Sequence, residues 1–299
     1  MIKRFLSYVE IKTKITSVFA FLFALAYLFS IGQKIYTLKT IVFFASMFLF
    51  DLTTTAINNY IDTKTNDQIL QFKRKNAFII IIVLFISSAA LGIYLAAVTD
   101  VVVLLLGALC FLCGVLYTYG PVPISRQPLG EVFSGFFYGV LIPFILLYIN
   151  MPSGTYLSLY LSAETINISL QIFPIITVLL LAVSPFCTTA NIMLANNICD
   201  LKKDIAVKRY TLPYYIGTKS LYLFAALYYI SYLSVIIMVI LKILSPICLL
   251  SLLTIFPVQK NINRFFKTQD KTTTFIYSVK NYVIIMAANS FVVFISRLI

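Results

Sequence analysis

The sequence contains no histidine and no tryptophan, and only 10 of its 299 residues are acidic. Without histidine, this chain cannot build a Ser-His-Asp or Cys-His catalytic centre, a histidine-ligated zinc site or a haem site with a proximal histidine. We therefore expect any metal to be bound by oxygen ligands. Charged residues make up only 11% of the chain, against about a quarter in an ordinary soluble domain.

Apolar residues are what the chain has in excess. They account for 61% of it, and the mean hydropathy is +0.98. A soluble core of this length cannot hide so much apolar surface, so the composition predicts an integral membrane protein. Five cysteines lie in or beside apolar runs, and their odd number argues against a disulfide framework. Cys110 and Cys113 have redox spacing, but we interpret them as small apolar residues of a leucine-rich run.

Nine apolar runs are long enough, or nearly so, to cross a bilayer as helices. They cover residues 15–32, 39–57, 77–98, 101–117, 132–150, 167–195, 220–241, 243–258 and 281–298. The first run lacks a small-residue cleavage site, so we expect it to be retained rather than removed as a signal peptide. Pro185 should kink the sixth run. The predicted fold is an all-α membrane bundle of nine helices in one domain, residues 1–299.

The basic residues are distributed unevenly over the predicted loops. Nineteen of the 23 fall on the side of the N-terminus, which by the positive-inside rule is the cytoplasmic side. With an odd number of spans, the C-terminus is expected outside. The net charge of +13 is thus explained by membrane orientation, and we expect no nucleic-acid partner.

Two similar polar motifs end the second and sixth runs. Residues 58–62 and 196–200 both read Asn-Asn-x-x-Asp, and another polar oxygen follows four residues later in each copy. On a helix, residues four apart share a face. The two predicted stripes are Asn58, Asp62 and Asn66, with Asp67 one residue round, and Asn196, Asp200 and Asp204. The copies lie 138 residues apart, which indicates two related halves of about 1–150 and 151–299.

A single motif of this kind is usually a helix cap or a solvated helix end. Two copies at equivalent places in the topology favour a shared site instead. A carboxylate inside a bilayer costs about 2.5–3.5 kcal/mol and usually faces a water-filled site. Carboxylate and amide oxygens without histidine suit Mg²⁺, especially Mg²⁺ carried by a phosphorylated substrate. The lysines and arginines after each motif mainly orient the protein, but one or two could grip phosphate oxygens.

With these motifs in view, the sequence resembles the UbiA superfamily of intramembrane prenyltransferases, and within it the branch that prenylates 1,4-dihydroxy-2-naphthoate in menaquinone synthesis. The stretches that carry the resemblance are residues 10–17, 116–124, 128–135, 196–204 and 208–217. The resemblance implies nine helices, Mg²⁺ as cofactor, and a polyprenyl diphosphate and an aromatic acceptor as substrates. It also implies a location in the cell membrane, with the active site facing the cytoplasm.

The resemblance assigns roles to residues of this chain. Asp62, Asp67, Asp200 and Asp204 are expected to hold the catalytic Mg²⁺, with Asn58, Asn66 and Asn196 beside them. The expected diphosphate-binding residues are Lys73, Arg74, Arg126 and Lys203, and the expected residues of the acceptor or prenyl pocket are Asp51, Asn59, Tyr117 and Asn197. Asn59 replaces an acid that the family often has in the first motif.

Several alternatives stay open at this level. Either Asn66 or Asp67 could ligate the metal, Asp51 could be structural or functional, and Glu131 could act in the site or simply cap a helix. The acceptor could be 4-hydroxybenzoate, homogentisate or a porphyrin. A cation-coupled transporter is the alternative from a different class, with the acids at helix ends rather than in mid-bilayer as the feature against it. No obligate protein partner is indicated.

Overall fold

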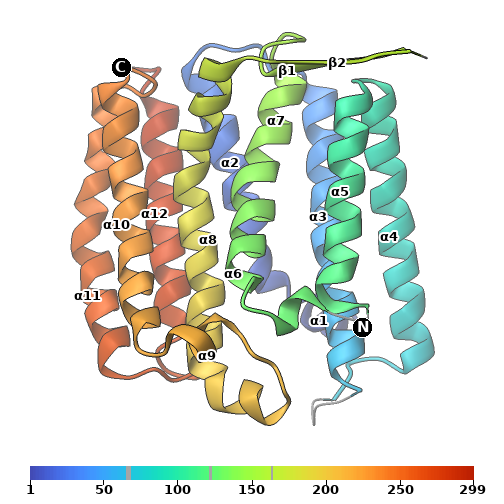
Figure 1. The fold of residues 1–299 in the computed structure, drawn as a ribbon, viewed down its shortest axis with the longest axis vertical. Coiled ribbons are helices and arrows are strands. Elements are labelled where there is room, and N and C mark those ends of the chain that lie inside the picture. Colours follow the sequence, from blue (N-terminus) through green and yellow to red (C-terminus); the bar gives the residue numbers. More distant parts are fainter. Residues whose placement is uncertain (65–68, 121–122, 163) are drawn as a thin grey trace. The chain divides into compact units, whose positions relative to one another are not determined.

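Figure 1 shows the computed structural model of the protein, which describes residues 1–64, 69–120, 123–162 and 164–299. Long helices dominate it. The chain forms two compact units, one made of residues 1–18 and 36–124 and the other of residues 19–35 and 125–299. Each unit has its own packing, so the two are described in turn. The predicted division at about residue 150 stays a prediction.

The first unit is built from three long helices and a short N-terminal segment. Its elements are α1 (Ile2–Tyr8), the 3₁₀ turn η1 (Ile11–Lys14), α3 (Thr37–Asp62), α4 (Arg74–Ala97) and α5 (Val101–Thr118). Asp100 begins α5 as a side-chain cap that accepts hydrogen bonds from two backbone amides of the first turn. The helices α3 and α4 pack against each other as neighbours along the chain.

The N-terminal segment is part of the core of this unit. The side chain of Tyr8 is fully buried, and it packs in a cluster with Leu52 and Ala56 of α3 and Ala77 and Ile81 of α4. Its hydroxyl donates to the Ala56 carbonyl at 2.9 Å. Burial raises the pKa of the Tyr8 hydroxyl well above its usual range. The segment is therefore anchored on α3 two turns before its end.

The second unit holds the remaining elements. These are most of α2 (Ile15–Ser30), α6 (Gly130–Ser134), the π-helical turn η3 (Gly135–Leu141), α7 (Ile142–Asn150), β1 (Leu157–Leu161), β2 (Ile166–Leu170), α8 (Ile172–Ala206), α9 (Leu212–Ile216), α10 (Lys219–Ile240), the 3₁₀ segment η4 (Pro246–Thr254), α11 (Ile255–Lys267) and α12 (Ile276–Ile295). The 3₁₀ turn η2 (Ile124–Arg126) precedes α6. The strands pair as an antiparallel hairpin, which was not predicted.

A glycine allows α8 to approach η3 closely. A Cβ atom on Gly139 would lie 2.3 Å from the backbone nitrogen of Phe186, so only glycine fits at this contact. Pro185 lies beside it within α8, which continues as one helix on both sides of the proline, and the predicted kink stays a prediction. At about 1.5 Å per residue, the 35 residues of α8 extend about 50 Å, well beyond a hydrocarbon core of about 30 Å. The polar last turns of α8 can therefore project out of the apolar layer.

Eight helical segments among the described residues are long and apolar enough to span a membrane. They are Ile11–Ser30, Thr37–Asp62, Arg74–Ala97, Val101–Thr118, Gly130–Asn150, Ile172–Ala206, Lys219–Ile240 and Ile276–Ile295. Less than a quarter of the apolar stretches of α4 and α5 is buried, which leaves apolar side chains facing outward as lipid-facing helices require. The prediction of a multi-pass helical membrane protein is confirmed. The count of nine and the orientation stay predictions.

Two predicted runs differ from the structure. The sixth was placed from residue 167, but residues 166–170 form β2 and the helix begins at Ile172. The eighth was placed at 243–258, whereas the helical segment in this part of the chain consists of η4 followed by α11 and ends at Lys267. The outer face of α11 carries the exposed residues Lys260, Asn263 and Arg264 and the half-buried Gln259. That polar face explains why apolar composition alone did not find its end.

Candidate metal and diphosphate site

The first Asn-Asn-x-x-Asp motif forms the last turns of α3. Asn58 and Asp62 lie one turn apart on the same face and are half-buried, and Asp62 is the last residue of the helix. Asn58 Oδ1 accepts a hydrogen bond from Thr118 Oγ1, at the end of α5, at 3.2 Å. Tyr117, expected in the acceptor or prenyl pocket, lies beside Thr118 in α5. Asn66 and Asp67, the remaining members of this predicted site, lie outside the described residues.

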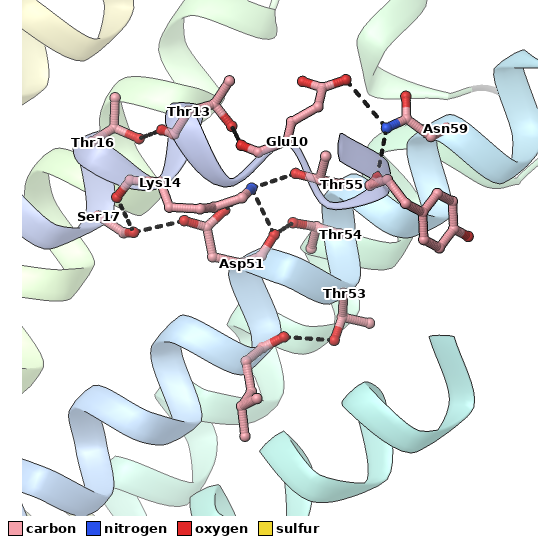
Figure 2. Close-up of polar contacts among 12 residues, drawn as sticks. Glu10, Thr13, Lys14, Thr16, Ser17, Asp51, Thr53, Thr54, Thr55 and Asn59 are labelled. Atoms are coloured by element: carbon pink, nitrogen blue, oxygen red, sulfur yellow. Dashed lines mark hydrogen bonds and ion pairs between the residues drawn. The ribbon is translucent and has the colours of Figure 1, made fainter. Parts of the chain in front are cut away.

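Asn59 is held by the N-terminal segment rather than by its own helix. Its Nδ2 donates to the carbonyl of Tyr8 at 2.9 Å and to Glu10 Oε1 at 3.2 Å (Figure 2). Glu10 has the left-handed φ of +47° that turns the chain between α1 and η1. The start of the chain therefore fixes the orientation of one side chain of the motif. Sequence reasoning had placed Asn59 only in the acceptor or prenyl pocket.

Asp51 forms a buried ion pair that the sequence did not indicate. Lys14 Nζ lies 2.8 Å from Asp51 Oδ1, and both side chains are about 95% buried. The same ammonium also donates to the Asp51 carbonyl and to Thr55 Oγ1, and Ser17 Oγ donates to Asp51 Oδ2 at 2.6 Å (Figure 2). In the sequence, Lys14 counts only as one of the nineteen basic residues on the predicted cytoplasmic side. The structure adds that its side chain is buried against Asp51, and the side on which it lies stays a prediction.

The first group of predicted diphosphate ligands lies at the junction of α3 and α4. Lys73 precedes α4, and Arg74 is its first residue; both are exposed. The guanidinium of Arg74 donates to the carbonyls of Tyr60 and Thr63 at 3.1 and 3.0 Å, and it lies 5.4 Å from the centre of the Tyr60 ring. A cation at the C-terminal end of a helix is favourable there. Arg74 thus already stabilises the helix end that carries Asp62.

The second motif lies on α8 as predicted. Asn196, Asp200 and Asp204 follow one another at intervals of four residues within the helix, which ends at Ala206. The ammonium of Lys271, between α11 and α12, lies 2.6 Å from Asp200 Oδ2 and also donates to Asn196 Oδ1. These two oxygens therefore converge on one cation. Lys203 lies exposed one residue before Asp204.

Asp204 is in a more enclosed place than Asp200. It is 6% exposed, its Oδ1 lies 3.9 Å from Arg209 Nε, and its Oδ2 accepts from Thr211 Oγ1 at 3.5 Å. Arg209 is brought back by a Schellman turn, in which Lys208 has a φ of +56° and the Arg209 amide donates to the Asp204 carbonyl at 2.8 Å. The chain after α8 therefore folds over Asp204, which the spacing of the motif does not indicate.

Glu131 connects α6 to the second motif. Asn197 Nδ2 donates to Glu131 Oε1 at 2.9 Å, and both side chains are at least 96% buried. Glu131 Oε2 and Asn197 Oδ1 are also buried and accept no hydrogen bond from any described residue. Arg126, the predicted diphosphate ligand before α6, is exposed, and its carbonyl accepts from the Tyr210 amide at 3.2 Å.

The donor set fits a hard divalent cation. Amide and carboxylate oxygens are the ligands that Mg²⁺ prefers, and Asn196 and Asp200 already hold a cationic group between them. Among the residues that the structure describes, there is no group of three or more acidic or cysteine side chains that could hold a metal ion by itself. A metal here would take its remaining ligands from diphosphate oxygens and water, as Mg²⁺ commonly does.

Fold and motifs together define the class as a multi-pass helical membrane protein with carboxylate and amide side chains near the ends of two of its helices. The chain belongs to the UbiA prenyltransferase family, whose model matches residues 17–279.

Individual relatives agree with this. The chain is 29% identical over 171 residues to the 1,4-dihydroxy-2-naphthoate octaprenyltransferase of Bacillus subtilis (strain 168), and the match covers 56% of this chain and about half (49%) of that relative. Among solved structures, a UbiA homologue from Aeropyrum pernix K1 has a TM-score of 0.64 at 18% identity, with 91% of this chain and 96% of that chain covered. A UbiA homologue from Archaeoglobus fulgidus, determined bound to GPP and Mg²⁺, also has a TM-score of 0.64, at 14% identity, with 99% and 100% covered.

Proposed function

We propose that the protein transfers a polyprenyl group from a polyprenyl diphosphate to an aromatic acceptor in a Mg²⁺-dependent reaction. The observation that carries the proposal is that side-chain oxygens of Asn196 and Asp200 converge on one positive charge, the Lys271 ammonium, in the last turns of α8. The chain is a member of a prenyltransferase family. A related fold has been determined with GPP and Mg²⁺ bound. The substrate tail is apolar, which explains a site on membrane-spanning helices rather than in a soluble domain.

The metal-binding residues are proposed from both motifs. Asp62 and Asp67 with Asn58 and Asn66 form the first set, and Asp200 and Asp204 with Asn196 form the second. When bound, Mg²⁺ would supply the positive charge that neutralises the diphosphate as it leaves. Whether Asn66 or Asp67 takes part in the first set is open to mutational test.

Basic residues beside the motifs are proposed to bind the diphosphate oxygens. They are Lys73, Arg74, Arg126 and Lys203. All four are exposed, so their ammonium and guanidinium groups can reach a bound anion, and charge-assisted hydrogen bonds of this kind are strong. Arg74 would do so only by leaving or sharing its contacts with the end of α3.

The acceptor is proposed to be 1,4-dihydroxy-2-naphthoate, giving demethylmenaquinone in its reduced, quinol form. In this reaction the C1–O bond of the allylic diphosphate breaks, a ring carbon forms a bond to C1 and loses its proton, and the ring carboxylate leaves as CO₂ with a proton taking its place. The Bacillus subtilis relative supports this choice of acceptor. Glu131 Oε2 and Asn197 Oδ1, buried acceptors with no described donor, suit a substrate that brings hydroxyl hydrogens. Asn59 and Tyr117 stay proposed residues of the acceptor or prenyl pocket. Of the two roles left open for Asp51, its buried pair with Lys14 favours the structural one.

The test is transfer by the purified full chain in lipid nanodiscs. A long-chain polyprenyl diphosphate is supplied with either 1,4-dihydroxy-2-naphthoate or 4-hydroxybenzoate, with Mg²⁺ or with EDTA, and products are identified by mass spectrometry. We expect a prenylated, decarboxylated naphthoquinol only with the naphthoate and Mg²⁺. Transfer to 4-hydroxybenzoate and not to the naphthoate would show that the proposed acceptor is wrong. Transfer to none of the acceptors tested would overturn the proposed function. Homogentisate and a porphyrin serve as further acceptors in the same assay.

The site is proposed to face the cytoplasm from the cell membrane. Nineteen of the basic residues lie on the predicted cytoplasmic side, together with the ends of α3 and α8 that carry the motifs. Labelling of single cysteines by a membrane-impermeant reagent in intact cells tests this directly. A cysteine introduced at Lys203 should be protected, and one at Lys242, in the turn after α10, should be labelled.

A further inference from the structure

In the structure, a lysine contacts the second motif that the sequence analysis did not assign to it. Lys271 lies in the connection between α11 and α12, 71 residues after Asp200. Its ammonium contacts Asn196 Oδ1 and lies 2.6 Å from Asp200 Oδ2, with the side chain of Lys271 36% exposed and that of Asp200 21% exposed. All three residues belong to the second unit. The Lys271 ammonium thus binds the same two oxygens, Asn196 Oδ1 and Asp200 Oδ2, that we propose as metal ligands.

The connection that carries Lys271 is held in one conformation by its own side chains. Asp270 Oδ1 accepts from the backbone amides and the hydroxyls of Thr272 and Thr273 at 2.6–3.0 Å. Gln269 Nε2 donates to two carbonyls at the end of α11 at 2.7 and 2.9 Å. Lys271 lies between these two anchors, and its ammonium is 4.8 Å from the centre of the Phe275 ring. Its position is therefore set by a preformed turn rather than by a long flexible loop.

We propose that Lys271 is a diphosphate-binding residue of the second motif and that it exchanges Asp200 for the substrate when the metal binds. The inference rests on the proposed function. An ammonium and a divalent cation cannot both take the same two oxygens at contact distance, because the two positive charges repel each other. A flexible four-carbon stem lets the ammonium move a few ångströms while the turn stays in place. A diphosphate bound with that metal would then offer the ammonium a new anion to contact.

This arrangement predicts opposite effects on two ligands. Lys271 competes with a bare divalent cation, so removing its charge should strengthen metal binding in the absence of diphosphate. It attracts the diphosphate, so the same change should weaken substrate binding. A lysine that only stabilised the fold would move both affinities in the same direction or neither.

The experiment compares the full chain in detergent with its Lys271→Met variant, which keeps the apolar stem and removes the charge. Mn²⁺ binding without diphosphate is followed by electron paramagnetic resonance, and binding of GPP in the presence of Mg²⁺ by calorimetry. A partly exposed ion pair contributes about 0.2–1 kcal/mol, so we expect Mn²⁺ to bind about 1.5- to 5-fold more tightly to the variant. We expect GPP to bind at least about tenfold more weakly, because a charge-assisted hydrogen bond is lost.

Two further variants make the result specific. Lys280→Met removes one charge from an exposed lysine near the start of α12, whose ammonium lies 5.6 Å from the centre of the Tyr277 ring. It should leave both affinities within about twofold of the wild type. Lys271→Arg should restore most of the GPP affinity. If Lys271→Met does not fold, Lys271→Gln replaces it in both measurements.

The inference is overturned if neutral variants of Lys271 change neither affinity or lower both. That result differs from failure of the proposed function, which would show as a wild-type protein that binds neither Mn²⁺ nor GPP. A wild type that binds both ligands, with variants that show no opposite effects, removes the role of Lys271 alone.

Discussion

The buried pair of Lys14 and Asp51 allows a sharp prediction about stability. Lys14→Met removes the ammonium but leaves the Asp51 carboxylate in an enclosure where both side chains are about 95% buried. Ser17 would still donate to Oδ2 at 2.6 Å. Breaking a buried ion pair by removing one partner typically costs about 3–5 kcal/mol, because the other charge is left without compensation. We expect a loss of this size in the free energy of unfolding.

The measurement is a titration with SDS in mixed micelles, with helicity followed by circular dichroism. Lys12→Met is the matched control, since Lys12 is an exposed base two residues away, and it should change the stability by no more than about 0.5 kcal/mol. The double variant Lys14→Met/Asp51→Leu removes both charges and should be more stable than Lys14→Met alone. A free energy of unfolding for Lys14→Met within about 1 kcal/mol of the wild type would refute the reasoning. So would a double variant whose loss of stability equals the sum of the losses of Lys14→Met and Asp51→Leu.

Three further predictions concern the site and the packing around it. Asp62→Ala and Asp200→Ala should each lower transfer about a hundredfold or more while leaving membrane insertion unchanged, and full activity of either variant would contradict its place in the metal site. Hydrogen bonds from Thr hydroxyls and amides lower the pKa of Asp270 to about 2, below its usual 3.8. The turn should therefore be fully formed above about pH 4 and loosen as the pH falls towards 2, and carboxyl NMR showing a midpoint near 4 would disprove this. Gly139→Ala should destabilise the protein by about 1–3 kcal/mol in thermal unfolding, whereas Gly107→Ala, with open space around it, should not.

Composition and periodicity were enough to predict the membrane helices. Eight of the predicted runs coincide with helical segments that are long and apolar enough to span a bilayer, because an uncharged stretch of this length has few other stable forms. The start of α8 was predicted too early, since the alternating isoleucine and leucine residues of β2 make it apolar enough to extend the run. Hydropathy measures the affinity of a segment for lipid and carries little information on where a strand ends and a helix begins.

The motif residues were predictable because their spacing is local. Asn196, Asp200 and Asp204 lie on one helix, and helical geometry alone places them on one face. Their partners were not predictable in this way. Lys271 reaches Asp200 across 71 residues and Lys14 reaches Asp51 across 37, and in the sequence both look like ordinary bases of the cytoplasmic side. Only packing distinguishes a lysine that orients a helix from one that neutralises a particular carboxylate.

The two lysine–aspartate pairs differ in burial, and this difference separates their roles. Lys14 and Asp51 are enclosed by α3 and the N-terminal segment, so exchange of partners would leave a charge buried, and the pair serves to fix the chain. Lys271 and Asp200 are partly exposed, so each can change its partner at low cost, and the pair can open when a competing cation arrives. In this protein a lysine near an acid is therefore structural where water is excluded, and we propose that it is functional where water and ligands have access.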